Sequence, residues 1–147
     1  MAGSVAGVKT THTGGCLCGA VRYEVRGTLR DVVNCHCTMC QRLHGTFGAH
    51  SKAKKADITV VDDSGLAWYS ASDRARRGFC RLCGANLFWQ PVDQDATGIV
   101  AGSLDPPTGL KTLGHIFVAE KSDYYVIADD LPCFDGSSNG GFEGDHL

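Results

Sequence analysis

Seven of the eight cysteines in the chain lie in three tightly spaced groups. The groups are Cys16-Leu17-Cys18, Cys35-His36-Cys37-Thr38-Met39-Cys40 and Cys80-Arg81-Leu82-Cys83. In an extended segment, residues i and i+2 project to the same side, so a C-x-C pair can present two sulfurs to one ion. A C-x-x-C pair does the same from a tight turn, and thiolates are preferred ligands of zinc. The spacing therefore predicts metal binding.

The first and third groups share a further feature, because each runs into the tripeptide Cys-Gly-Ala. Gly19 and Gly84 can adopt a positive φ, which lets the backbone curl and aim amide N–H groups at the thiolates. We therefore assign the cysteines of both groups to one closed, tetrahedral zinc site with a structural role. Its ligands are Cys16, Cys18, Cys80 and Cys83. The alternative, a redox-active C-x-x-C pair of the thioredoxin type, lacks the expected βαβ setting and leaves the C-x-C pair unexplained.

The middle group offers three ligands, Cys35, Cys37 and Cys40, and no obvious fourth. Zinc with three protein ligands keeps a position open for water or substrate, so we predict a catalytic zinc here. Candidates for the fourth ligand are Cys133, His36, His44, His50 and His115. The apolar context of Cys133 favours a buried, inert thiol. His36 lies between two ligands, where alternation turns it to the other face, so we expect it to form hydrogen bonds instead.

The elements that must position these cysteines are mostly short strands, because apolar residues alternate with period two between frequent turn residues. We predict strands near 20–26, 31–34, 46–51, 58–61, 66–70, 86–90, 99–102, 115–117 and 124–127. The one helix is expected at about 39–43. With 147 residues, the chain suffices for a single domain. We place a flexible leader at 1–12, the zinc domain at 13–136 and a flexible polar tail at 137–147.

The charge balance argues against some classes of partner. A formal net charge of −2 and a sequence pI near 6.3 give no general attraction to nucleic acid. No apolar stretch is long enough to span a membrane, and no secretory signal precedes the domain, so we expect a cytoplasmic protein. Basic residues gather in two places, Lys52, Lys54 and Lys55, and Arg74, Arg76, Arg77 and Arg81. They are either a solvated face or a dock for the carboxylates of an anionic substrate.

Three stretches carry a family resemblance. They are Gly14-Gly15-Cys16-Leu17-Cys18-Gly19-Ala20-Val21-Arg22-Tyr23, the Cys35 to Cys40 cluster, and Arg77-Gly78-Phe79-Cys80-Arg81-Leu82-Cys83-Gly84. Together they resemble the glutathione-dependent formaldehyde-activating enzyme family, which also includes centromere protein V. The resemblance implies a mainly β, β-tent fold of antiparallel sheets, a structural zinc on the first and third groups, and a more labile zinc on the middle group.

The resemblance and the open site together predict a zinc-dependent carbon–sulfur lyase or thiol–aldehyde adduct synthase. Its substrate would be a glutathione-type adduct such as S-hydroxymethylglutathione, with proton transfer by His36, His44 or His50. One alternative is a non-catalytic zinc module that binds a protein or chromatin partner. Another is an enzyme of the same kind that uses a different small thiol or electrophile. The sequence leaves open whether the protein is a monomer or a homodimer.

Overall fold

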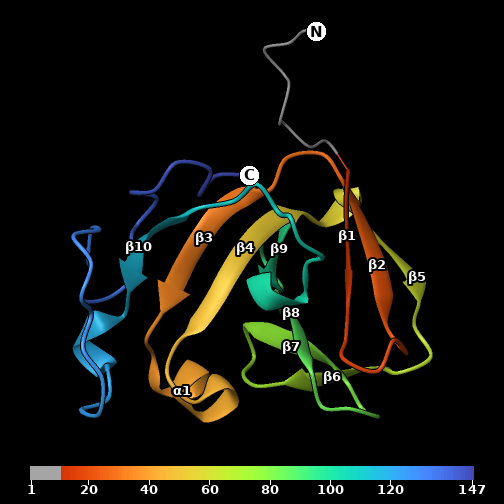
Figure 1. Cartoon of the computed structure of the whole chain (residues 1–147), viewed down its shortest axis with the longest axis horizontal. Coiled ribbons are helices and arrows are strands. Elements are labelled where there is room, and N and C mark those ends of the chain that lie inside the picture. Colours follow the sequence, from red (N-terminus) through yellow and green to blue (C-terminus); the bar gives the residue numbers. More distant parts are fainter. Residues whose placement is uncertain (1–10) are drawn as a thin grey trace, which may run out of the picture.

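The computed structural model describes residues 11–147 and shows two β-sheets with one short helix (Figure 1). The small sheet has the order β1-β2-β5 and the large sheet the order β10-β3-β4-β9-β8-β7-β6. The strands are β1 (Thr11–Gly15), β2 (Arg22–Arg26), β3 (Arg30–Cys35), β4 (Gly48–Lys54), β5 (Ile58–Asp62), β6 (Leu66–Ser70), β7 (Ala75–Cys80), β8 (Asn86–Pro91), β9 (Ala96–Val100) and β10 (Thr112–Ile116). The helix α1 spans Thr38–His44, and three 3-10 turns are η2 (Lys55–Asp57), η3 (Ala101–Ser103) and η4 (Val118–Glu120).

The two sheets lean together at one end of the molecule and spread apart at the other. Figure 1 shows β3 and β4 sloping to one side and β1, β2 and β5 to the other, with α1 near the spread end. The mainly β fold predicted from the sequence is confirmed. One pairing differs from the antiparallel expectation, because β10 runs parallel to β3. Parallel neighbours need a long crossover, and the chain passes through most of the large sheet before β10 joins β3.

Alternating side chains build the core between the sheets. In β2, Tyr23 and Val25 are buried, whereas the arginines and the glutamate between them face outward. The Tyr23 ring meets Phe88 of β8 edge to face at a centroid distance of 5.0 Å. Its hydroxyl lies 2.6 Å from Ser103 Oγ, so the polar tip is satisfied. Burying each large apolar side chain contributes about 2 kcal/mol to the free energy of folding. This core supports the strands that carry the cysteines.

Most predicted strands lie where the structure has them, with shifted ends. The predicted strand at 99–102 lies earlier, in β9, and is followed by η3, while 124–127 has no strand. The sequence analysis missed two strands, β1 and β7. In β7, two arginines obscure the alternation of apolar and polar residues, and β1 begins at Thr11, inside the stretch assigned to the leader. The rest of that leader, 1–10, lies outside the described residues.

The segment after residue 136 packs against the domain, although we expected a loose tail. Phe142 is only 8% exposed and meets Phe134 edge to face at 5.2 Å. Asp145 Oδ1 pairs with Arg30 Nη1 at 3.1 Å, and Lys52 Nζ donates to the Asp145 carbonyl at 2.6 Å. Figure 1 shows the chain end beside the upper part of β3 and β4. The two cations of β3 and β4 therefore hold the C-terminal residues.

The Arg30–Asp145 pair is nearly enclosed, since its side chains are 11% and 8% exposed. Burial works against ionising Asp145, but hydrogen bonds from the Phe142 amide and the Ser138 hydroxyl, together with Arg30, lower its pKa.

Within residues 11–147, no helix is long and apolar enough to cross a membrane.

Asp145→Asn is expected to lower the free energy of unfolding by about 3 kcal/mol at neutral pH, because it leaves a buried guanidinium without its counter-charge. Urea denaturation of the wild type and the variant measures the difference. The difference should shrink as the pH falls, since protonation of a carboxylate with a lowered pKa removes the pair in the wild type as well. Glu143→Gln removes the same charge from an exposed neighbour and should change stability by less than about 0.5 kcal/mol. Equal stability of Asp145→Asn and wild type would contradict the prediction.

Candidate metal centres and the adjoining cavity

The first cysteine group combines two turns that are far apart in the sequence. Cys16 and Cys18 follow β1, while Cys80 ends β7 and Cys83 lies in the turn before β8. Their four Sγ atoms lie within 4.8 Å of one another. Gly19 and Gly84 have φ of 86° and 82°, as the Cys-Gly-Ala repeats predicted. The four cysteines assigned to one site are therefore brought together by the fold.

Backbone amides surround these sulfurs. The Val21 N–H donates to Cys16 Sγ at 3.2 Å. Amide N–H groups of Ala85 and Cys18 lower the pKa of Cys83 to about 6. The amide of Ala20 also favours the Cys18 thiolate, but desolvation and three neighbouring sulfurs raise its pKa to about 11. Neighbouring sulfurs therefore oppose the Cys18 thiolate but favour that of Cys83, and a cation among the four would favour the thiolate form of all of them.

The second group lies where β3 meets α1. Cys35 is the last residue of β3, Cys37 caps the helix, and Cys40 lies in its first turn. Their Sγ atoms lie within 4.8 Å of one another. Cys37 accepts hydrogen bonds from the other two thiols and, at 3.3 Å, from the Cys40 N–H, which lower its pKa to about 2. The sulfurs of Cys37 and Cys40 raise the pKa of Cys35, so the three thiols do not all ionise unless a cation joins them.

Both donor sets fit zinc, because each presents three or four thiolates within reach of one ion. Among the described residues, the second group has no fourth histidine, cysteine or carboxylate within that distance. His36, His44, His50, His115 and Cys133 all lie outside it. Cys133 also differs from its expected environment, since its thiol is exposed and lies 3.6 Å from the Leu131 carbonyl.

His36 forms hydrogen bonds, as its position between two ligands predicted. His115 Nε2 lies 3.0 Å from a carboxylate oxygen of Asp129, so this nitrogen carries the proton. His115 Nδ1 then accepts from His36 Nε2 at 2.9 Å, and His36 Nδ1 accepts from the Tyr125 hydroxyl. Burial lowers the pKa of His36, in agreement with a neutral ring. This chain of hydrogen bonds anchors the loop that carries Cys35 and Cys37.

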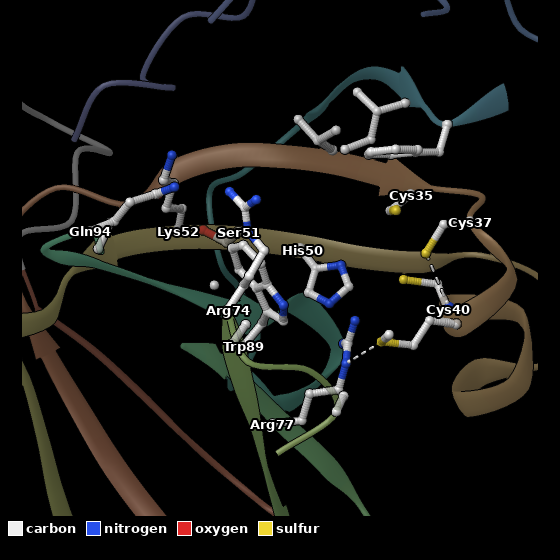
Figure 2. Close-up of a pocket in the computed structure, with 18 of the residues that line it drawn as sticks. Cys35, Cys37, Cys40, His50, Ser51, Lys52, Arg74, Arg77, Trp89 and Gln94 are labelled. Atoms are coloured by element: carbon white, nitrogen blue, oxygen red, sulfur yellow. Dashed lines mark hydrogen bonds between the residues drawn. The ribbon is translucent and has the colours of Figure 1, made fainter. Parts of the chain in front are cut away.

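A cavity of about 410 Å³ opens beside the second group. Figure 2 shows the three cysteines at one end, Lys52 and Gln94 at the other, and His50 between them. Among residues 11–147, four cationic side chains line the cavity and no aspartate or glutamate does; the cations are Arg30, Lys52, Arg74 and Arg77. The walls between them are largely apolar and include Trp89 and Phe117. The cavity therefore suits an anion that carries a soft, metal-binding atom.

The four cations are not equally available. All three donor nitrogens of Arg30 are used inside the protein, by the Asp31 carbonyl, Asp145 and the His50 carbonyl. Lys52 gives one hydrogen bond to Asp145, and Arg77 Nε lies 3.2 Å from Met39 Sδ. Lys52, Arg74 and Arg77 therefore retain N–H donors for a ligand.

The family model described as glutathione-dependent formaldehyde-activating enzyme matches residues 11–120. The chain belongs to this family. A crystal structure of a Rhodobacter sphaeroides protein from a structural genomics project is similar to it, with 28% sequence identity and a TM-score of 0.58. That likeness covers 70% of this chain and 98% of the other. The match to the family model ends before Tyr125, Asp129 and Asp145, so these partners of the site come from the segment that follows it.

The sequence did not reveal the His115–Asp129 pair or the burial of Arg30. It also left open which of the histidines lines the cavity, which the structure shows to be His50. Asp129 and Asp145 are single acidic residues in irregular segments, and nothing in their spacing marks them. One signal was available. The strand predicted at 46–51 places Gly48 and His50 on one face, and in the structure β4 continues this alternation to Lys52. His50 and Lys52 line the cavity.

Cys80→Ser is expected to remove one of two bound zinc equivalents and to lower the free energy of unfolding by more than about 3 kcal/mol. The reason is that a structural zinc supplies folding free energy on the order of 10 kcal/mol, which the broken site loses. Elemental analysis and urea denaturation measure both effects. Cys133→Ser, at an exposed cysteine outside both groups, should change neither. Full metal content and stability in Cys80→Ser would refute the assignment.

Proposed function

We propose that this protein forms or cleaves a carbon–sulfur bond between a glutathione-type thiol and an aldehyde, as in S-hydroxymethylglutathione. The observation that carries the proposal is the three-cysteine group at the end of a cationic cavity, which no acidic residue of the described part of the chain lines. Family membership supports the reaction class, and the cavity volume lies within the range of small-molecule sites.

In this proposal, Cys35, Cys37 and Cys40 hold the catalytic zinc, and the four-cysteine group holds the structural one. When bound, a zinc ion lowers the pKa of a coordinating thiol and so favours its thiolate. The protein side chains position the rest of the substrate. Arg74, Arg77 and Lys52 attract its carboxylates, while Trp89 and Phe117 exclude water around its stem.

A non-catalytic zinc module is the competing function. It would need no cavity, and an exposed basic face would serve a nucleic-acid partner better than cations that line a hollow. Metal exchange separates the two functions. A catalytic site should lose or exchange one zinc readily when thiol is added, whereas a purely structural protein should retain both ions and bind no thiol.

Cys37→Ser is expected to lower turnover of the thiol adduct by more than about 100-fold, because losing a ligand costs more than losing one of its supporting hydrogen bonds. The variant should keep one zinc equivalent in the four-cysteine site. Turnover of S-hydroxymethylglutathione and elemental analysis are measured together, with Cys133→Ser as the matched control. Unchanged turnover in a folded Cys37→Ser protein would show that the reaction does not use this site.

Arg77→Gln is expected to raise the KM for a carboxylated thiol about tenfold, since a charge-assisted hydrogen bond contributes at least about 1.4 kcal/mol. The KM for an uncharged thiol such as mercaptoethanol should change little. Arg76→Gln is the matched control, because Arg76 points the other way and stacks 3.9 Å above the Trp68 ring. Equal KM changes in the two variants would mean that Arg77 does not contact the substrate.

A further inference from the structure

His50 is held firmly in the wall of the cavity. It lies in β4, near the middle of the large sheet, and pairs with Val33 of β3 on one side and Val100 of β9 on the other. Its ring projects into the cavity between the cysteine end and Arg74 (Figure 2). Gly48 makes room for it, since a Cβ there would come within 2.5 Å of His50 Cε1. The ring therefore has one fixed place.

The hydrogen bonds of His50 determine which nitrogen is protonated. Nδ1 lies 3.0 Å from the Gly48 carbonyl, which can only accept, so Nδ1 carries the hydrogen. Nε2 then carries a lone pair. This atom is buried and has no hydrogen-bond partner among the described residues. Leaving a buried acceptor unpaired costs about 1–3 kcal/mol, which a ligand with an O–H donor would recover.

Burial, together with the charges around it, keeps the His50 ring neutral. Burial lowers its pKa to about 4, and the nearby His44, Arg77 and Arg30 add to the effect, partly offset by the Gly48 carbonyl. The other histidines near the second cysteine group are less suited to meet a substrate. His36 has both nitrogens committed, and His44, whose ring lies 5.7 Å from that of His50, does not line the cavity.

We propose that His50 Nε2 accepts a hydrogen bond from the hydroxyl group of the thiol adduct and exchanges a proton with it. This inference rests on the proposed function and adds a catalytic residue to it. In cleavage, the hydroxyl proton passes to Nε2, the O–H electron pair becomes the second bond of the aldehyde C=O, and the C–S pair leaves on sulfur. In synthesis, the incoming thiol gives its proton to Nε2 and its sulfur pair attacks the aldehyde carbon. The second C=O pair moves to the oxygen, which then takes the proton from Nε2.

The environment of His50 decides how it handles the proton. Its low pKa makes Nε2 a weak base, so the imidazolium formed during the reaction returns its proton readily to sulfur or oxygen. The cationic neighbours would also favour the developing negative charge on that oxygen. In the absence of substrate, the same groups keep the lone pair free.

Nitrogen NMR of the full-length, zinc-loaded protein with labelled histidine tests the hydrogen bond directly. His50 should show a protonated Nδ1 and an unprotonated Nε2 at neutral pH. Adding S-(2-hydroxyethyl)glutathione, a stable hydroxyl analogue, should shift the Nε2 signal, whereas S-ethylglutathione, which lacks the hydroxyl, should not. Equal responses to the two analogues, or an Nε2 signal typical of metal coordination before either is added, would overturn the proposal.

Kinetics test the proton transfer. His50→Gln should keep a KM near that of wild type, because its amide can still hydrogen-bond the hydroxyl, but lose about 100-fold or more in kcat. His50→Ala should lose at least as much and recover part of it when imidazole is added, since the lost ring leaves space that opens to the cavity. His146→Gln, at an exposed histidine, serves as the control.

Metal analysis of each variant keeps the two hypotheses apart. With two zinc equivalents retained, wild-type kcat in His50→Ala would overturn the role of His50 and leave the proposed function standing. A wild-type protein that turns over no thiol adduct would overturn both. A loss of kcat that imidazole does not restore, together with no analogue-dependent shift of Nε2, would show that His50 acts only through structure.

Discussion

The mutual repulsion of crowded thiolates governs this structure. Each cysteine group holds its sulfurs within 4.8 Å of one another, a spacing at which the thiols share hydrogens and cannot all ionise. A cation bound to them would turn that repulsion into attraction and would link segments that lie far apart in the sequence in the four-cysteine group. In the four-cysteine group the cation would have a full set of ligands, whereas the three-cysteine group leaves room for one more.

The rest of the fold supports this unequal pair. Two glycines with positive φ curl the turns of the four-cysteine group until amides face the sulfurs. In the three-cysteine group, support comes from a distance. The hydrogen-bond chain from Asp129 through His115 and His36 to Tyr125 holds the loop between β3 and α1 from behind. A fully satisfied chain of this kind restricts a loop more than its separate bonds would.

The two ends of the cavity present different polar groups. The three thiols lie at one end, and Lys52 and Gln94 lie at the other (Figure 2). Arg30 is neutralised internally by Asp145, which leaves Lys52, Arg74 and Arg77 to meet a ligand. Between the ends lies His50, neutral and with one unpaired nitrogen. A substrate with sulfur at one end, a hydroxyl nearby and carboxylates further away would meet the cysteine group, His50 Nε2 and the cations, respectively.

Both cysteine groups and most of the strands could be predicted from the amino-acid sequence. Those features are local, since ligand spacing, Cys-Gly-Ala turns and period-two alternation are set by neighbouring residues. Only the tertiary structure decided the rest. The docking of Asp145 on Arg30 and the partners of His36 join segments far apart along the chain, and the packing around β4 buries His50 Nε2 without a partner among the described residues. Such contacts depend on which elements pack together, and a single residue in an irregular segment has no periodic pattern to announce them.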